Sequence, residues 1–576
     1  MRVDTGFPLQ FWDYVAFGVY FVVLSFIGLW AGRKKKKDAA DYFLAGRSLP
    51  WYVVGGSFIA SNISTEHFVG MIGAAYVYGI CVAQSEWSTI VSYTLLIWFF
   101  IPFLMAARVF TTPEFLERRF NAWVRHFFAV VTVVSNVVAF LAAVLYGGGL
   151  ALHKLFGWNL WFAIVALGVV AGSWAIYGGL RSVAWTDLFT VAIMIAGGFM
   201  VTILGLLAVS GESHSLVEGL RTILEKNRAN EGIWAEAVMK TAQHIVHRDY
   251  YNRLAILQPI SHEVVPWPAL LFAAFYVGIW YNVVNQFMIQ RVLGAKNLYH
   301  ARMGIVFASY LKIVLPIIIV LPGLIFFAKY PELMLLPWSK VRPEADKGYI
   351  AMLQLLVPVG LRGLFLAALF GAIQSTVNSV LNSTATVFTL DIYKRLLHRH
   401  VSETSVIRMG IASSVAILVI SIVLAGFIGR LSGSLFVYIQ SLYAFFAPPF
   451  SAIFLLGVVS RRINGTGATV GVALSFVLGI GMKIFVQVQP HPIWLEPFAM
   501  QAIVNFVFCA ILTIAVSLAT DRPRPEQVTD DLTLNWRKLN IFADLGNHWF
   551  SSVTFWWAGA FAAFIGLVVL FSGRFL

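Results

Sequence analysis

Residues 61–68, SNISTEHF, interrupt a long apolar stretch. WYVVGGSFIA precedes them and VGMIGAAYVYGICVA follows, so Glu66 and His67 lie where a membrane span is otherwise expected. A charged side chain at the centre of a bilayer costs about 3 kcal/mol or more unless it faces a cavity or a partner. Either the segment is no membrane span, or its polar break serves a purpose.

The composition is that of an integral membrane protein. Of the 576 residues, 59% are hydrophobic and 12% are charged, whereas soluble globular proteins carry about 25% charged residues. The net charge is +14, but the basic residues lie in short loops between apolar segments, which argues against a nucleic-acid partner. Cys81 and Cys509 provide no disulfide framework and no metal motif.

Fourteen apolar segments have about the 20 residues that a bilayer crossing needs. They lie near residues 10–31, 51–83, 86–107, 126–152, 158–178, 185–210, 266–290, 303–328, 356–390, 408–428, 433–459, 464–485, 499–519 and 551–573. We interpret residues 1–576 as a single all-α transmembrane domain. The basic cluster 33–37 follows the first segment, which predicts an uncleaved helix whose N-terminus is outside the cell.

The basic residues of the loops predict that both termini are extracytoplasmic. The loops then assigned to the cytoplasm contain most of these residues, among them Arg108, Arg125, Arg291 and Arg302. The loop 211–264 lies on the opposite side, and its apolar spacing predicts partly helical structure, which we interpret as a surface cover. The sequence contains no P-loop, HExxH or nucleophile-elbow motif, which argues against an enzyme or an ATP-driven pump.

Two apolar segments contain polar breaks. Residues 51–83 would form a helix about 50 Å long, which exceeds the hydrocarbon core of about 30 Å. Five spans later, residues 266–290 contain Asn282 and Asn285. Interrupted segments at corresponding positions of two halves are typical of inverted-repeat transporters, although polar contacts between helices remain an alternative for the second segment.

This pairing predicts a core of two five-helix repeats. Spans two to six form the first repeat, and spans seven to eleven form the second. The predicted parts are an extra N-terminal helix (10–31), repeat 1 (51–210), the extracytoplasmic loop (211–264), repeat 2 (266–459) and C-terminal helices (464–576).

Few other polar side chains lie within the predicted spans. Glu86 begins the third span, Lys312 lies deep in the eighth, and Gln440 lies within LFVYIQSLYAFF. The ninth span carries the adjacent hydroxyls of Ser375 and Thr376 in a dense polar patch. Sodium prefers oxygen ligands, which unwound carbonyls and such hydroxyls supply.

These segments resemble the sodium:solute symporter family, and within it the sodium–glucose cotransporters. The resemblance covers nearly the whole chain, and it rests on SNISTEHFVGMIGAAYVYGI (61–80), SEW (85–87), GGLRSVAWTDL (178–188), NQFMIQRVLGAK (285–296) and LNSTATVFTLDIYKR (381–395). It implies fourteen spans, a core of two inverted repeats with discontinuous first and sixth core helices, and alternating access.

The resemblance also implies which residues form the sites. Its sodium site falls on the carbonyl groups of Ala60, Ile63 and Ala372 and on the hydroxyls of Ser375 and Thr376. Its sugar site falls on Asn62, His67, Glu86, Tyr281, Lys312 and Gln440. Met71 and Phe436 match residues that close over the sugar from outside, and Tyr281 matches a gate beneath it. This set suits a neutral polyol, which both donates and accepts hydrogen bonds.

A candidate second sodium site falls on Asp187 and Ser379. The alternative is that Asp187 pairs with Arg181 or caps a helix start. Other positions depart from the family. Gly278 and Asn282 stand beside the gate, where relatives carry polar or aromatic residues. Ser85 replaces an outer-gate aromatic of one branch, and His67 is the animal type. These departures leave the particular sugar open.

The predicted function is sodium-driven import of a neutral sugar, a hexose such as glucose or galactose. The alternatives are a sodium symporter for another solute (inositol, sialic acid or an amino acid) and a proton-coupled sugar symporter in which His67 or Glu86 titrates. The expected partners are sodium ions, the sugar and the lipid bilayer, with no nucleic acid and no obligatory protein partner. The expected location is the plasma membrane, which is the inner membrane in a bacterium.

Overall fold

The computed structural model describes residues 9–33, 38–64, 66–246, 251–348, 352, 356–397, 401–428, 435–488, 490–535 and 542–573, without the side chains of 69, 139, 154–155, 396–397, 428 and 435–439. Within this part of the chain the structure is helical, with isolated β-bridges and no strand. The predicted all-α architecture is confirmed.

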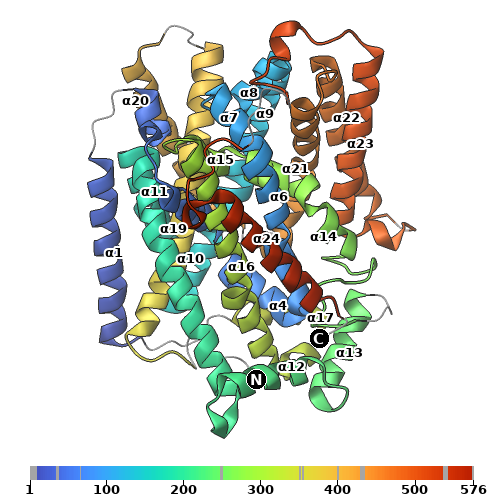
Figure 1. Ribbon diagram of the computed structural model, residues 1–576. Coiled ribbons are helices and arrows are strands. Elements are labelled where there is room, and N and C mark those ends of the chain that lie inside the picture. Colours follow the sequence, from blue (N-terminus) through green and yellow to red (C-terminus); the bar gives the residue numbers. More distant parts are fainter. Residues whose placement is uncertain are drawn as a thin grey trace.

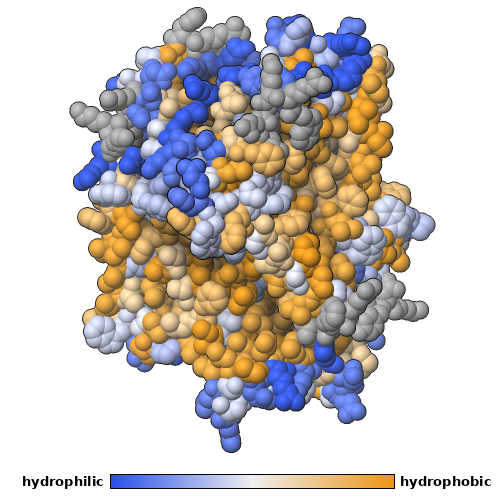
Figure 2. All heavy atoms as spheres, viewed as in Figure 1, coloured by the Kyte–Doolittle hydropathy of each residue, from blue (hydrophilic) through white to orange (hydrophobic). Residues whose placement is uncertain are grey.

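The helices of the bundle lie side by side, the long ones mostly along one direction (Figure 1). They are α1 (Phe11–Gly32), α3 (Trp51–Asn62), α4 (Ile72–Tyr78), α6 (Thr89–Leu95), α7 (Ile101–Ala107), α9 (Ala122–Ser135), α10 (Ala142–Phe156), α11 (Leu160–Val209), α14 (Trp267–Ala273), α15 (Gln286–Leu293), α16 (Leu298–Lys329), α19 (Leu361–Val387), α20 (Glu403–Ile428), α21 (Leu435–Val459), α22 (Gly465–Phe485), α23 (Phe498–Ala519) and α24 (Val553–Leu570). Figure 2 shows a broad hydrophobic band between hydrophilic ends, as a bilayer requires.

Twelve helical segments of the described chain are long and apolar enough to cross a membrane. Two of them far exceed one crossing: residues 66–107 number 42 and residues 160–209 number 50. Each contains a glycine with left-handed backbone, Gly79 at φ +80° and Gly179 at φ +59°, where the chain leaves one helix and enters the next. The predicted count of fourteen spans stays a prediction.

The first core helix is discontinuous, as expected from SNISTEHF. Helix α3 ends at Asn62, Ile63 is extended at φ −82° and ψ 124°, and a π-helical turn (Glu66–Met71) leads into α4. Side chains replace the lost helical hydrogen bonds: the Ser64 amide donates to His67 Nδ1 at 3.2 Å, and the Glu66 amide donates to Ser64 Oγ at 3.2 Å. Unwound backbone at this depth is stable because such partners satisfy it.

The sixth core helix is broken in the same way. Helix α14 continues through π-helical turns (Ala274–Gly278 and Trp280–Val284) to Asn285, which is extended at φ −68° and ψ 123°. The Asn285 side chain accepts from the Phe287 amide at 3.4 Å and caps α15. The two discontinuous core helices are therefore confirmed.

Helix α3 packs against α16 through backbone contact. An ideal Cβ on Gly55 would lie 2.3 Å from the carbonyl oxygen of Gly304. Both helices run in the same direction, because a parallel bridge pairs Leu49 with Ala295 just ahead of them. Asn62 lies about 10 Å beyond Gly55 along the axis of α3, and Lys312 lies about 12 Å beyond Gly304 along the axis of α16. The close approach of α3 to α16 thus brings these two side chains together.

A buried ion pair joins four helices at the centre of the bundle. Arg291 of α15 and Asp187 of α11 are each 1% exposed, and Arg291 Nη2 lies 3.3 Å from Asp187 Oδ2. Arg291 Nε donates to Ser57 of α3 at 2.7 Å, and its Nη2 donates to Ser379 of α19. The prediction that Arg291 lies in a cytoplasmic loop is wrong, and Arg302, counted with it, is buried as well.

The loop 211–264 carries two amphipathic helices, α12 (Leu216–Asn227) and α13 (Gly232–Ile245), which match the predicted helical segments. They lie at the lower end of Figure 1, where α1 begins and α24 ends. Other short helices are α2 (Ala39–Phe43), α5 (Gln84–Trp87), α8 (Thr112–Arg119) and α17 (Trp338–Ala345).

We predict that Arg291→Met lowers stability by about 3–5 kcal/mol, because it leaves Asp187 buried without a counter-charge. The double variant Asp187→Asn/Arg291→Met leaves no net charge there and is expected to melt at a higher temperature than Arg291→Met. Melting temperatures of the purified protein in one detergent test this. A double variant that melts at or below Arg291→Met contradicts it.

We predict that Gly55→Ala pushes α3 away from α16 and costs about 1–3 kcal/mol, seen as a lower melting temperature. The control is Gly566→Ala in α24, where an added Cβ meets nothing within 4 Å. That variant should keep or raise the melting temperature, because alanine is the better helix former. Equal effects of the two substitutions would show that the close contact is unimportant.

Candidate functional site

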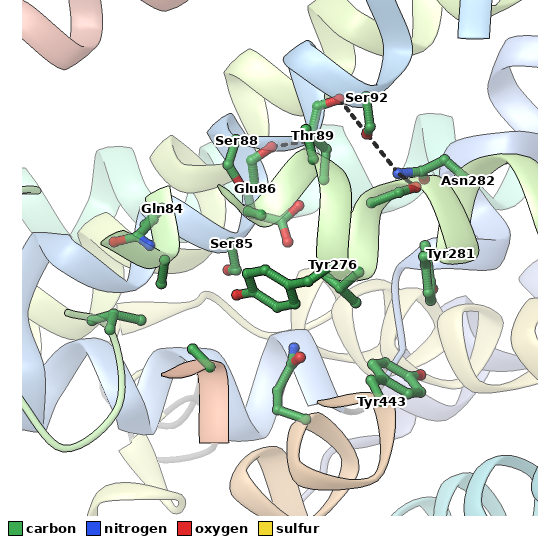
Figure 3. Close-up of a pocket in the computed structure, with 18 of the residues that line it drawn as sticks. Gln84, Ser85, Glu86, Ser88, Thr89, Ser92, Tyr276, Tyr281, Asn282 and Tyr443 are labelled. Carbon is green, nitrogen blue, oxygen red and sulfur yellow. Dashed lines mark hydrogen bonds between the residues drawn. The ribbon is translucent and has the colours of Figure 1, made fainter. Parts of the chain in front are cut away.

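A cavity lies beside both helix breaks, and Figure 3 shows part of its lining. It collects nearly all of the residues that the sequence assigned to a solute site: Asn62, His67, Met71, Glu86, Tyr281, Lys312 and Gln440. The side chain of Phe436 lies outside the described part of the chain. Residues from both repeats thus meet in one cavity.

A charged pair forms the polar wall of the cavity. Lys312 Nζ lies 2.5 Å from Glu86 Oε2 and also donates to Asn62 Oδ1. His67 Nε2 lies 3.4 Å from Glu86 Oε1. Because the Ser64 amide donates to His67 Nδ1, the neutral ring carries its proton on Nε2 and directs it towards Glu86. Each charge therefore has a partner, as buried charges require.

Tyr281 closes one side of the cavity. Its hydroxyl accepts from Asn62 Nδ2 at 2.9 Å. Its ring centroid lies 5.6 Å from those of Phe287 and Tyr443, and Tyr443 in turn stacks on Phe140 at 4.8 Å. An aromatic layer therefore lies behind Tyr281, and the position of Tyr281 beneath the solute stays a prediction.

Residues outside the two broken helices also line the cavity. Val264 and Val265 precede α14, and Phe498 and Ala499 lie at the start of α23. Helix α23 belongs to the C-terminal helices, outside the two repeats, and no sequence motif pointed to its part in this wall.

Several further polar residues of the cavity were not assigned to it from the sequence. Glu66 accepts from Gln440 Nε2 at 3.0 Å, so it faces the cavity. Others are Gln84, Ser88, Thr89, Ser92, Tyr276 and Tyr443. Thr89 follows Glu86 by three positions on a continuing helical path, so the i, i+3 rule applied from Glu86 identifies it.

Three of the five groups expected to bind sodium converge beside the first break. The Thr376 hydroxyl lies 3.1 Å from the carbonyl oxygen of Ile63 and 3.1 Å from that of Ala372. Two neutral carbonyl oxygens and a hydroxyl form a set of ligands that fits a sodium ion. The Ile63 carbonyl belongs to extended backbone and the Ala372 carbonyl to helix α19. Ala60 is buried in the preceding turn of α3.

Ser375 has a different partner from Thr376. Its hydroxyl donates to Asp187 Oδ1 at 2.7 Å rather than pointing to the carbonyls of Ile63 and Ala372. Ser375 therefore joins the residues expected to bind sodium directly to the buried ion pair.

Asp187 and Ser379 lie close together, but a guanidinium lies between them. Asp187 Oδ2 accepts from Ser57 at 2.6 Å, and Ser379 shares a hydrogen bond of 2.7 Å with Ser61. Arg291 contacts both Asp187 and Ser379. The alternative that Asp187 pairs with Arg181 is wrong: Arg181 donates to Ser48 at 3.3 Å. Nor does Asp187 cap a helix, because it lies well inside α11.

Comparison with known proteins gives consistent findings. The chain is 33% identical over 550 residues to the sodium/glucose cotransporter of Vibrio parahaemolyticus, which covers 93% of this chain and 96% of that protein. It is 30% identical over 558 residues to the human sodium/myo-inositol cotransporter, a match that covers 92% of this chain and 76% of that protein. A substrate-bound, outward-open Na⁺-coupled sialic acid symporter superposes with a TM-score of 0.72 at 21% identity, over 89% of this chain and 99% of that one.

The family model of the sodium:solute symporter family matches residues 42–474, a range that contains both broken helices and the residues that line the cavity from the two repeats. Together with the relatives, this match identifies a sodium-coupled membrane transporter rather than an enzyme. The chain belongs to the sodium:solute symporter family.

Proposed function

We propose that this protein imports a neutral sugar, a hexose such as glucose or galactose, together with sodium by alternating access. The observation that carries the proposal is the cavity in which Asn62, Glu86, Lys312 and Gln440 meet beside the broken helices. The sodium/glucose cotransporters among the relatives support the same solute class.

The chemistry of the lining favours an uncharged polyol. Glu86 accepts hydrogen bonds, Lys312 donates them, and the Asn62 and Gln440 amides do both. Lys312 is already neutralised by Glu86 at 2.5 Å. The described lining contains no arginine, the residue that most often holds a carboxylate. A sugar with its apolar face on Tyr281 uses each of these groups.

The proposed sodium site and solute site share one piece of backbone. Asn62 contacts Lys312 and Tyr281, while the carbonyl of the next residue, Ile63, contacts Thr376. An ion held by Ile63, Ala372 and Thr376 fixes the end of α3, and so fixes Asn62 for the solute. Ser375 joins this set once its hydroxyl turns from Asp187 to the ion.

The driving force is sufficient for strong accumulation. One charge that moves through 100 mV provides about 2.3 kcal/mol, which corresponds to roughly fifty-fold accumulation of the solute at about 1.4 kcal/mol per tenfold. A second ion at Asp187 and Ser379 would double this energy, and it requires Arg291 to withdraw from between them.

We further propose that the protein lies in the plasma membrane, or in the inner membrane of a bacterium, with both termini extracytoplasmic, and that it acts without an obligatory protein partner. In this orientation we expect the part of the lining formed by Val264 and Phe498 to face outwards and the aromatic layer of Tyr281 and Tyr443 to face the cytoplasm.

Uptake into proteoliposomes tests the function. The purified protein is supplied with radiolabelled glucose, galactose, myo-inositol, sialic acid and an amino acid, each with a sodium gradient, with choline, or with a pH gradient. The proposal expects hexose uptake that requires sodium. Preference for another solute, or uptake that follows the pH gradient in choline, overturns the corresponding part.

Thr376→Ala is predicted to raise the sodium concentration needed for half-maximal uptake by about tenfold, because it removes one ion ligand. The matched control is Ser383→Ala on the same helix, since the Ser383 hydroxyl bonds only to its own helix at Val380, 3.0 Å away, among the described contacts. Uptake measured against sodium concentration distinguishes the two. An unchanged requirement in Thr376→Ala removes this residue from the sodium site.

Glu86→Gln is predicted to weaken sugar binding about tenfold or more, since hydrogen bonds to a charged group contribute about 1.5–3 kcal/mol. Gln440→Ala is predicted to weaken it by up to about tenfold, since hydrogen bonds of a neutral amide contribute about 0.5–1.5 kcal/mol. Sugar-induced quenching of tryptophan fluorescence measures the affinity, and elution as a single species in detergent checks folding. If both folded variants bind sugar as tightly as the unmodified protein, neither residue belongs to the site.

A further inference from the structure

Asn282 lies in the cavity wall, on the broken helix next to the gate residue Tyr281. Its side chain is 1% exposed, and it lines the cavity together with Ser92 and Gly278. In Figure 3 it stands opposite Gln84, with Glu86 and Tyr276 between them. The Oδ1 atom of Asn282 is buried and has no hydrogen-bond partner among the described residues.

A directional chain of hydrogen bonds fixes which amide atom remains without a partner. Asn282 Nδ2 donates to Ser92 Oγ at 2.8 Å and to the Gly278 carbonyl at 3.1 Å. The Ser92 hydroxyl donates its only hydrogen bond to the Thr89 carbonyl at 2.8 Å, so it can only accept a hydrogen bond from Asn282. A flipped amide would place Oδ1 against the Gly278 carbonyl, where two acceptors repel each other.

Gly278 makes this arrangement possible. A Cβ built on Gly278 would lie 2.8 Å from the Cβ of Ser92, so any side chain there would push Ser92 away from Asn282. Gly278, Ser92 and Asn282 therefore act as one unit that holds the Asn282 amide in a single orientation.

We propose that Asn282 is a specificity-determining residue whose Oδ1 accepts a hydrogen bond from a hydroxyl of the transported solute. The inference rests on the proposed sugar transport and names one further contact in that site. A buried acceptor without a donor is unfavourable, and a solute hydroxyl supplies the donor. A ring ether oxygen, a carboxylate or a missing hydroxyl at that point leaves Oδ1 unpaired, and the site discriminates against such a solute.

The experiment compares three proteins: the unmodified chain, Asn282→Ala, and Asn136→Ala as matched control. Asn136 is also buried, its Nδ2 also donates to a hydroxyl (Thr384, 2.9 Å), and its Oδ1 also has no partner among the described residues, but it does not line the cavity. The hexose with the highest uptake and its complete set of monodeoxy analogues are measured as competitors of labelled uptake. Tryptophan quenching gives the affinities independently of transport.

In the unmodified protein, one monodeoxy analogue should bind about fivefold more weakly than the parent because it lacks the hydroxyl that faces Asn282. In Asn282→Ala the affinity for the parent hexose should fall by the same factor. The parent and that one analogue should then bind equally well, while the affinity ratios of the other deoxy analogues stay unchanged. Asn136→Ala should retain the affinity ratio between the parent hexose and every deoxy analogue. A loss of discrimination at one position alone is the supporting result.

Two other outcomes overturn the inference and are distinguishable. If the unmodified protein binds the hexose and Asn282→Ala keeps all of its deoxy ratios, Asn282 does not contact the solute although the sugar function stands. If no hexose binds the unmodified protein, the sugar function fails and this inference fails with it. If Asn282→Ala does not fold, Gly278→Ala takes its place, because it displaces Ser92 from Asn282. It must change the affinity ratio of the same single deoxy analogue. Unchanged affinity ratios in Gly278→Ala count against the proposal.

Discussion

The pairing of Asp187 with Arg291 is the interaction on which the arrangement of the helices depends. A carboxylate and a guanidinium that are each 1% exposed are stable only in contact with each other and with further hydrogen bonds. Ser57, Ser375 and Ser379 supply those bonds from α3 and α19. Four helices from both repeats therefore have to meet at one point, and that point lies beside the residues proposed to bind sodium.

The helix breaks turn this rigid centre into a site. An unbroken helix has no free carbonyls in its middle, and a bilayer does not tolerate free ones. The polar residues of SNISTEHF resolve that conflict, since Ser64 and His67 satisfy the local backbone while Ile63 keeps a carbonyl directed at Thr376. The residues proposed for the solute and for the ion, Asn62 and Ile63, are consequently consecutive in the chain, so a displacement of one moves the other.

Much of the candidate site was predictable from the sequence. Polar residues in apolar spans are rare, so each one indicates a cavity. Asn62, Glu86, Lys312 and Tyr281 were placed together on that basis and by family resemblance. Arg291 was misplaced, because counting charges between spans assumes that an arginine near a helix end faces water. The partner of Ser375 and the orientation of Asn282 depend on contacts between helices distant in sequence, which no local pattern contains.

The contact of Gly55 with Gly304 has a consequence for how affinity differs between the two sides of the membrane. Helices that touch through their backbones move as one rigid body, so Asn62 and Lys312 keep their spacing whichever way the cavity opens. Gln440 and Tyr443 belong to α21, and among the described glycines none brings the backbone of α21 against α3 in this way. Under the proposed alternating access, tight binding outside and easy release inside would arise from α21 approaching and leaving a solute that α3 and α16 continue to hold.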